Sequence, residues 1–136
     1  MNILFNLIPK EKVAYINNNS TLRQAMEKME YHRYTAVPII NEDGKYVGVL
    51  REGDILWYIK DLESFDLTKA EKIDISSVPR KKDHTCVSVT AKFDELIELS
   101  YNQNFIPVVD DLDNFIGIVT RKSIITYLVE NTKGEK

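Results

Sequence analysis

Apolar and polar positions along the chain alternate in short blocks that predict β-strands and amphipathic helices. Runs of β-branched and apolar residues flank the acidic turns at 41–44 and 111–114, a pattern that is typical of β-hairpins. Asn, Asp and Gly suit such turns, because Gly adopts positive φ freely and the Asn and Asp side chains bond to nearby backbone. A further short strand is predicted ahead of each hairpin, at 13–16 and at 86–89.

Helical spacing of apolar residues predicts a helix before and after each hairpin. The helices after the hairpins are predicted over 52–59 and 121–129, and the polar stretch 61–77 is predicted to be a partly helical connector. Ser20 is predicted to cap the helix ahead of the first hairpin, because its hydroxyl can accept a hydrogen bond from a free backbone N–H. The two leading helices have the apolar stripes Leu22, Ala25, Met26 and Met29, and Phe93, Leu96 and Ile97 with Ser100 or Tyr101.

The second half of the chain repeats the first. Segment 36–50 is echoed by segment 105–119, which places Pro38 and Pro107 69 residues apart. Each copy has the order strand, helix, strand, strand, helix, and each small sheet has an apolar face that must pack against another element. The sequence therefore predicts an α+β fold (α/β mixed) of two tandem repeats packed with pseudo-twofold symmetry.

Composition predicts one small globular module and excludes several partners. The chain has 136 residues, 43% of them apolar and 29% charged, so the repeats at 1–66 (with the N-terminal segment) and 67–136 are predicted to form one module. A net charge of -3 gives no general attraction to nucleic acid or to an anionic membrane. The apolar start at 1–8 is too short for a membrane span and lacks the basic flank of a signal peptide. Cys86 is the single cysteine, so it is predicted to fill core space in a cytoplasmic protein without disulfides.

Both hairpins belong to the same ordered motif. It consists of hydrophobic-x-Pro-hydrophobic-hydrophobic, an acidic turn, hydrophobic-Gly-hydrophobic and a polar tetrad that opens a helix. Present twice over about residues 7–129, this motif resembles the CBS (cystathionine-beta-synthase) repeat. The segments Lys12-Val13-Ala14, Tyr34 to Pro38 and Thr120-Arg121-Lys122 are similar to the stand-alone CBS-pair receptors for cyclic di-AMP in Gram-positive bacteria.

The resemblance implies a ligand sensor and not an enzyme. CBS pairs bind adenine nucleotides in clefts where the repeats meet and generally assemble as homodimers, so Leu56, Trp57, Ile124, Ile125 and Leu128 are expected dimer contacts. The family's usual tetrad is Thr or Ser, two variable residues and Asp. Here Arg51-Glu52-Gly53-Asp54 keeps only the Asp, and Thr120-Arg121-Lys122-Ser123 keeps only the hydroxyl. A ribose clamp of the common AMP-binding type is therefore incomplete in both copies.

The two tetrads carry opposite charges at predicted helix starts. Basic side chains are unfavourable at a helix N-terminus by roughly 0.3 to 1 kcal/mol each unless an anion is bound. Arg121 and Lys122, with the Thr120 hydroxyl and backbone N–H groups, therefore predict a phosphate site. Glu52 and Asp54 already satisfy their own helix start and would repel phosphate. Whether the second cleft, with Arg51, Asp54, Phe105, Ile106 and Pro107, is also occupied is left open.

Adenine is expected to pack beside this phosphate site on the apolar edge at 13–14 and 34–38. The resemblance implies that Lys12 adds a further positive charge near the phosphates. The alternative is that the basic residues are solvated surface charges and Tyr34 belongs to the core. The full set of predicted ligand-binding residues is Lys12, Val13, Ala14, Tyr34, Thr35, Ala36, Val37, Pro38, Thr120, Arg121, Lys122 and Ser123.

Other patterns predict no chemistry. The triplet 80–82 is basic and predicted to be a solvated loop, and His32 and His84 lack the spacing of a zinc site. No catalytic motif or cofactor motif is present. The leading hypothesis is a sensor of cyclic di-AMP, AMP, ADP, ATP or an adenosyl compound that signals to a separate target protein. A ligand-independent dimerisation or adaptor module is the main alternative, and a small enzyme is the third.

Overall fold

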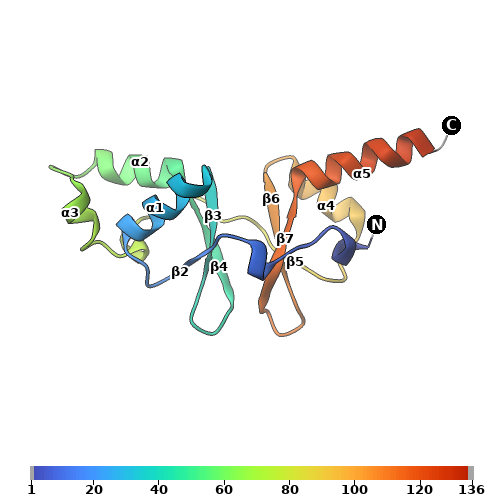
Figure 1. The fold of residues 1–136 in the computed structure, drawn as a ribbon, viewed down its shortest axis with the longest axis horizontal. Coiled ribbons are helices and arrows are strands. Elements are labelled where there is room, and N and C mark those ends of the chain that lie inside the picture. Colours follow the sequence, from blue (N-terminus) through green and yellow to red (C-terminus); the bar gives the residue numbers. More distant parts are fainter. Residues whose placement is uncertain (1, 135–136) are drawn as a thin grey trace. The chain divides into compact units, whose positions relative to one another are not determined.

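The computed structural model describes residues 2–134, with side chains as far as residue 132, and divides the chain into two compact units. One unit is Ala14–Asp83, and the other combines Met1–Val13 with His84–Lys136 (Figure 1). The sequence groups residues 1–13 with the first repeat, whereas in the structure they pack with the second, because Ile8 and Pro9 add a strand to its sheet.

The unit Ala14–Asp83 contains a three-stranded sheet in the order β2-β3-β4, in which β2 and β3 are parallel and β3 and β4 form the predicted hairpin. Its helices lie on one face of this sheet (Figure 1). The strands are β2 (Ile16–Asn17), β3 (Ala36–Ile40) and β4 (Tyr46–Arg51). The helical segments are α1 (Leu22–His32), α2 (Glu52–Lys60), α3 (Leu67–Ala70) and η3 (Ile75–Ser77), so the connector is partly helical as predicted.

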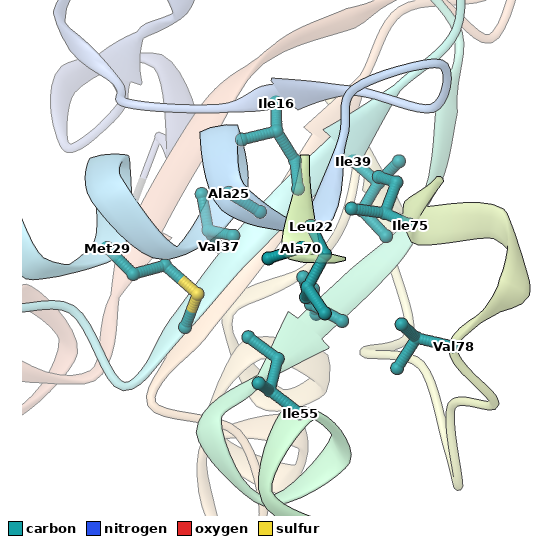
Figure 2. Packing of buried hydrophobic residues seen from close by; sticks show 11 residues of the cluster. Ile16, Leu22, Ala25, Met29, Val37, Ile39, Ile55, Ala70, Ile75 and Val78 are labelled. Atoms are coloured by element: carbon teal, nitrogen blue, oxygen red, sulfur yellow. The ribbon is translucent and has the colours of Figure 1, made fainter. Parts of the chain in front are cut away.

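The core of this unit is formed by the face of the sheet that α1 and α2 cover. Figure 2 shows side chains from strands, both helices and the connector directed into one space. Leu22, Ala25 and Met29 of the predicted stripe are buried there, and Ala70 and Ile75 of the connector are buried with them. The connector is therefore part of the first repeat's core as well as a link between repeats.

Two local predictions are wrong in this region. Thr21, and not Ser20, caps α1: Thr21 Oγ1 accepts a hydrogen bond from Gln24 N at 3.1 Å, and Gln24 Oε1 accepts one from Thr21 N at 2.9 Å. This reciprocal capping box satisfies two donors, whereas a single Ser would satisfy one. The strand predicted at 13–16 is limited to Ile16–Asn17, because Lys10–Lys12 forms a 3-10 turn that delays entry into the sheet.

The second unit has a four-stranded sheet in the order β1-β7-β6-β5. The pairs β1/β7 and β6/β7 are antiparallel and β5/β6 is parallel, so the second hairpin is also confirmed. Its helices α4 and α5 pack on β6 and β7, and α5 extends beyond its predicted end. The elements are η1 (Ile3–Phe5), β1 (Ile8–Pro9), η2 (Lys10–Lys12), β5 (Val87–Ser88), α4 (Phe93–Ser100), β6 (Phe105–Val109), β7 (Phe115–Thr120) and α5 (Arg121–Gly134).

Gly117 allows β1 to approach β7. Its φ of 154° is rarely adopted by residues with a side chain, and a Cβ there would overlap the carbonyl oxygen of Ile8 and lie 3.0 Å from Leu7 Cδ1. Both conditions require glycine at this position. The pairing of Pro9 with Gly117 therefore depends on this glycine. The sequence repeat shows a glycine at the same position in both copies, but it does not show the reason for it.

We expect Gly117→Ala to lower the free energy of unfolding by at least about 2 kcal/mol, because it adds both backbone strain and overlap. Gly53→Ala is the matched control: Gly53 lies in α2, and its Cβ would meet only Trp57 Nε1 at 3.9 Å. This control should be neutral or stabilising by up to about 1 kcal/mol. Urea denaturation measures both, and equal stabilities of the two variants would contradict the role of Gly117.

Candidate functional site

The start of α5 is held by hydrogen bonds within its first turn. Thr120 Oγ1 accepts a hydrogen bond from Ser123 N at 3.1 Å, which makes Thr120 the N-cap. Ser123 Oγ donates to the Thr120 carbonyl oxygen at 2.8 Å. The Thr120 hydroxyl uses its acceptor side in the cap, so its O–H remains a donor for a ligand.

The two basic residues of this turn have different surroundings. Arg121 N donates to the Asn104 carbonyl at 2.9 Å, and Arg121 Nε donates to the Ser100 carbonyl at 2.8 Å. Arg121 is therefore anchored to the end of α4. Lys122 is exposed, and its ammonium makes no hydrogen bond or ion pair with any other residue that the structure describes. Of the two residues predicted to bind phosphate, Arg121 therefore anchors the helix start and Lys122 is an accessible cation.

Lys12 belongs to the same unit as this helix start. It ends η2, the 3-10 turn that packs beside β7, and its side chain is exposed, whereas Val13 next to it is buried. β7 ends at Thr120. The structure therefore brings six of the twelve predicted residues into one compact unit: Lys12, Val13, Thr120, Arg121, Lys122 and Ser123.

A pocket of about 300 Å³ lies at the start of α5. Its lining residues are Asn6, Thr120, Lys122, Ser123, Thr126, Tyr127 and Glu130. The sequence predicts three of these residues and misses four. Three of the missed residues lie one and two turns beyond Ser123 on the same face of α5, so helical spacing could have found them. Asn6 has no such signal, because only the packing of the N-terminal segment brings it to this helix.

The other six predicted residues belong to the unit Ala14–Asp83. Tyr34 and Thr35 follow the end of α1, where Arg33 adopts a left-handed conformation with φ 58° and ψ 38°. Tyr34 is 38% exposed and its ring stacks on His32 with 5.2 Å between ring centroids, so Tyr34 is a surface residue and not a core residue.

Three of these residues are less accessible than a ligand contact requires. Ala14 and Val37 are buried, and Val37 packs in the core of its own unit. Pro38 is also buried in β3. Their contribution to a binding surface is therefore limited to backbone shape.

The first tetrad is engaged by residues 80–83, where the connector continues beyond residue 77. Asp54 Oδ2 accepts a hydrogen bond from Arg51 N at 3.0 Å, and Asp54 Oδ1 accepts one from Lys81 N at 3.4 Å. The Arg51 guanidinium donates to the Lys82 carbonyl oxygen. These contacts place residues 80–83 against the start of α2 and occupy both ends of the tetrad.

Asp83 fastens the connector to β4. Its Oδ1 accepts hydrogen bonds from Val49 N at 2.9 Å and from Arg80 Nε at 2.8 Å. Burial raises the pKa of Asp83, but the hydrogen bonds from Arg80 and Val49 outweigh it, and the pKa lies below its ordinary value. Of the basic triplet, the two lysines are exposed as predicted for a solvated loop, whereas Arg80 is partly buried in an ion pair with Asp83.

The remaining reactive side chains have structural surroundings. His84 is buried beside Phe105, with Nε2 3.1 Å from Asn104 Oδ1. Burial raises the pKa of the half-buried Cys86 thiol, which keeps it protonated at neutral pH and a poor nucleophile. Within residues 2–134, no three potential metal ligands are grouped together, and no helix is long and apolar enough to cross a membrane.

Comparison with known proteins identifies the class of this fold. The model of the CBS domain matches twice, at residues 6–61 and 75–130, so the chain belongs to the CBS domain family and contains a tandem pair. It is 26% identical over 127 residues to cyclic di-AMP receptor B of Bacillus subtilis, covering 90% of this chain and 82% of the receptor. A crystal structure of CbpB in complex with c-di-AMP is similar with a TM-score of 0.82 and 26% identity, covering 100% of this chain and 91% of that one.

Some relatives are much longer enzymes. The chain is 29% identical over 115 residues to inosine-5'-monophosphate dehydrogenase of Methanocaldococcus jannaschii, which covers 83% of this chain. The match spans about a fifth of the dehydrogenase, 21% of its length. CBS pairs thus occur both within enzymes and in small proteins such as the receptor.

We expect the Asp83 ion pair to stabilise the fold in a pH-dependent way. Because the folded pKa lies below the ordinary value of 3.8, the contribution is present above that value and is lost as the pH falls through the folded pKa. Asp83→Asn should therefore destabilise the protein by about 1 kcal/mol at pH 7, with a smaller difference at pH 3. Urea denaturation at both pH values measures this. The control is Asp43→Asn in an exposed turn, and a difference of the same size at both pH values would rule out the ion pair as the cause.

Proposed function

We propose that this CBS pair is a non-catalytic cytoplasmic sensor that binds an adenine nucleotide, preferably cyclic di-AMP, and signals to a separate target protein. The observation that carries the proposal is the basic first turn of α5. Its exposed Lys122 and the Thr120 hydroxyl line a pocket in the unit that also contains Lys12. The similarity to cyclic di-AMP receptor B supports the same ligand class.

The phosphates are assigned to the start of α5 by charge. Lys122 is unfavourable beside the partly positive helix N-terminus, and a bound anion removes that cost. The Thr120 hydroxyl and the ammonium groups of Lys122 and Lys12 supply donors to phosphate oxygens. Arg121 has the different role of holding the turn in place through its bond to the Ser100 carbonyl.

Adenine is assigned to the residues around the start of β3. Tyr34 offers an exposed ring, Thr35 an exposed hydroxyl and Ala36 a small side chain that lets a planar base approach the strand. The backbone at 13–14 supplies donors and acceptors for the polar edge of the base. In this proposal the buried Val37 and Pro38 support the surface from beneath.

Cyclic di-AMP is preferred over AMP because of the residue at the end of the tetrad. An Asp at position 123 would hold free ribose hydroxyls, and Ser123 has a shorter, neutral side chain that already donates to Thr120. In cyclic di-AMP the ribose 3′ oxygen is esterified, so a carboxylate there would repel the phosphodiester. Two phosphates also match two exposed lysines better than one does.

The first tetrad is proposed not to bind phosphate. Asp54 and Asp83 place two carboxylates there, and Arg51 is bonded to the connector carbonyl. The residues Phe105, Ile106 and Pro107 are all buried. One nucleotide per chain is therefore the expected stoichiometry.

Calorimetric titration with cyclic di-AMP, AMP and ATP tests the function. Cyclic di-AMP should bind most tightly, at one site per chain, and Lys122→Glu should weaken it more than about tenfold because an attractive charge becomes repulsive. The melting temperature of the ligand-free variant should stay equal or rise, since a carboxylate suits a helix start.

Lys92→Glu is the matched control, because Lys92 is an exposed lysine at the start of α4. It should leave binding unchanged. If the wild-type protein bound none of the three nucleotides at tens of micromolar, the sensor proposal would fail and the adaptor alternative would be favoured. If AMP displaced cyclic di-AMP at equal concentration, the ligand would be a general adenine nucleotide.

A homodimer is proposed from exposed apolar side chains on α2 and α5. Leu56, Trp57, Ile125 and Leu128 are 56%, 61%, 52% and 39% exposed, which is unusual for such large side chains. Ile124 is 1% exposed in the core of its own unit, so its prediction as a dimer contact is wrong.

Light scattering at micromolar concentration should give the mass of two chains, and Trp57→Glu should lower it toward one. Tyr101→Glu is the control, because Tyr101 is also exposed but lies in the turn after α4. Circular dichroism establishes that both variants are folded. A one-chain mass for the wild-type protein would contradict the dimer.

A further inference from the structure

The pocket on α5 extends well beyond the residues assigned to phosphate. Thr126, Tyr127 and Glu130 follow Ser123 at helical spacing on one face of α5, and Asn6 faces them from the N-terminal segment. At 1.5 Å per residue, Glu130 lies about 12 Å from Lys122 along the helix axis. The pocket thus has a cationic end at the first turn and an acidic end two turns later.

The middle and far parts of the pocket have polar groups that the protein does not use. The side chains of Asn6, Thr126 and Glu130 make no hydrogen bond or ion pair with another residue among those described. Tyr127 is half-buried, and its ring meets Phe93 of α4 edge-on with 4.8 Å between centroids. The pocket is therefore lined by an aromatic ring packed on Phe93 and by an amide, a hydroxyl and a carboxylate that the described residues leave without a hydrogen-bond partner.

This chemistry fits a nucleoside better than a second phosphate. A phosphate at the far end would meet the Glu130 carboxylate, whereas an exocyclic amino group of a base or a ribose hydroxyl would donate to it. The Tyr127 ring provides an apolar wall for a planar base, and Asn6 can both donate and accept. A volume of about 300 Å³ is at the small end of ligand sites and suits one nucleoside.

We propose that this pocket binds the second nucleoside of a ligand with two nucleosides and two phosphates. The inference rests on the proposed function, in which the phosphates lie at Thr120 and Lys122 and the first adenine lies at the start of β3. The pocket continues from the same phosphate residues along α5, so the second nucleoside is assigned to it. Glu130, Thr126 and Asn6 are therefore specificity-determining residues that separate a cyclic dinucleotide from a mononucleotide.

The test compares cyclic di-AMP with AMP on the double variant Thr126→Val with Glu130→Ala. Both replacements are tolerated in an exposed helix, and melting followed by circular dichroism checks the fold. The ratio of the two affinities is the readout, because loss of the Glu130 charge changes the general attraction for both anions alike. We expect the preference for cyclic di-AMP over AMP to fall by about tenfold or more, as a charge-assisted hydrogen bond is lost.

Glu95→Ala is the matched control, since Glu95 is an exposed carboxylate on α4 outside the pocket, and its ratio should equal that of the wild type. An unchanged ratio in the double variant would overturn the inference while leaving the proposed function intact. Wild-type binding of AMP without cyclic di-AMP would also overturn it. Wild-type protein that binds neither nucleotide would overturn the proposed function itself, and this inference with it.

Discussion

The pairing of two N-terminal residues with β7 is the interaction on which the candidate site depends. Ile8 and Pro9 lie antiparallel to Ile118 and Gly117, and the approach is possible only because residue 117 has no side chain. This short strand holds η2 beside β7. Lys12 and the start of α5 come from opposite ends of the sequence, and this pairing is what places them in one compact unit.

The duplication produced two similar helix starts with different chemistry. At α2, the Asp54 carboxylate accepts a hydrogen bond from the N-cap backbone and from the connector, so charge is balanced within the protein. At α5, Ser123 occupies the corresponding position and donates to Thr120, and Lys122 forms no ion pair with any described residue. One repeat thus uses its tetrad for its own stability, and the other retains a charge that an anion can neutralise.

Anchoring and accessibility explain why neighbouring basic residues have different roles. The Arg121 guanidinium reaches back to the last residue of α4, which fixes the direction in which α5 begins. Lys122 is one residue further, and the helical rotation of about 100° per residue turns its side chain away from α4. A rigid first turn with one accessible cation is better organised for a phosphate than two mobile side chains would be.

The sequence by itself determined the two repeats, both hairpins, the four main helices and the basic start of α5. These features follow from the period of apolar residues and from the residue types at a strand-to-helix junction, which are local properties. It also predicts an anion site at Thr120 and Lys122, because charge at a helix start has the same consequence in any fold.

Only the tertiary structure decided which segments share a unit and which polar groups are already used. Residues 1–13 join the second repeat, Asp83 accepts a hydrogen bond from Val49 N, Ile124 is buried, and Asn6 faces α5. Each of these depends on contacts between segments far apart in the sequence, and the residue types involved are equally compatible with solvent exposure. The local sequence pattern does not show whether such a side chain is exposed, buried or paired. That outcome depends on which residues from other segments pack against it.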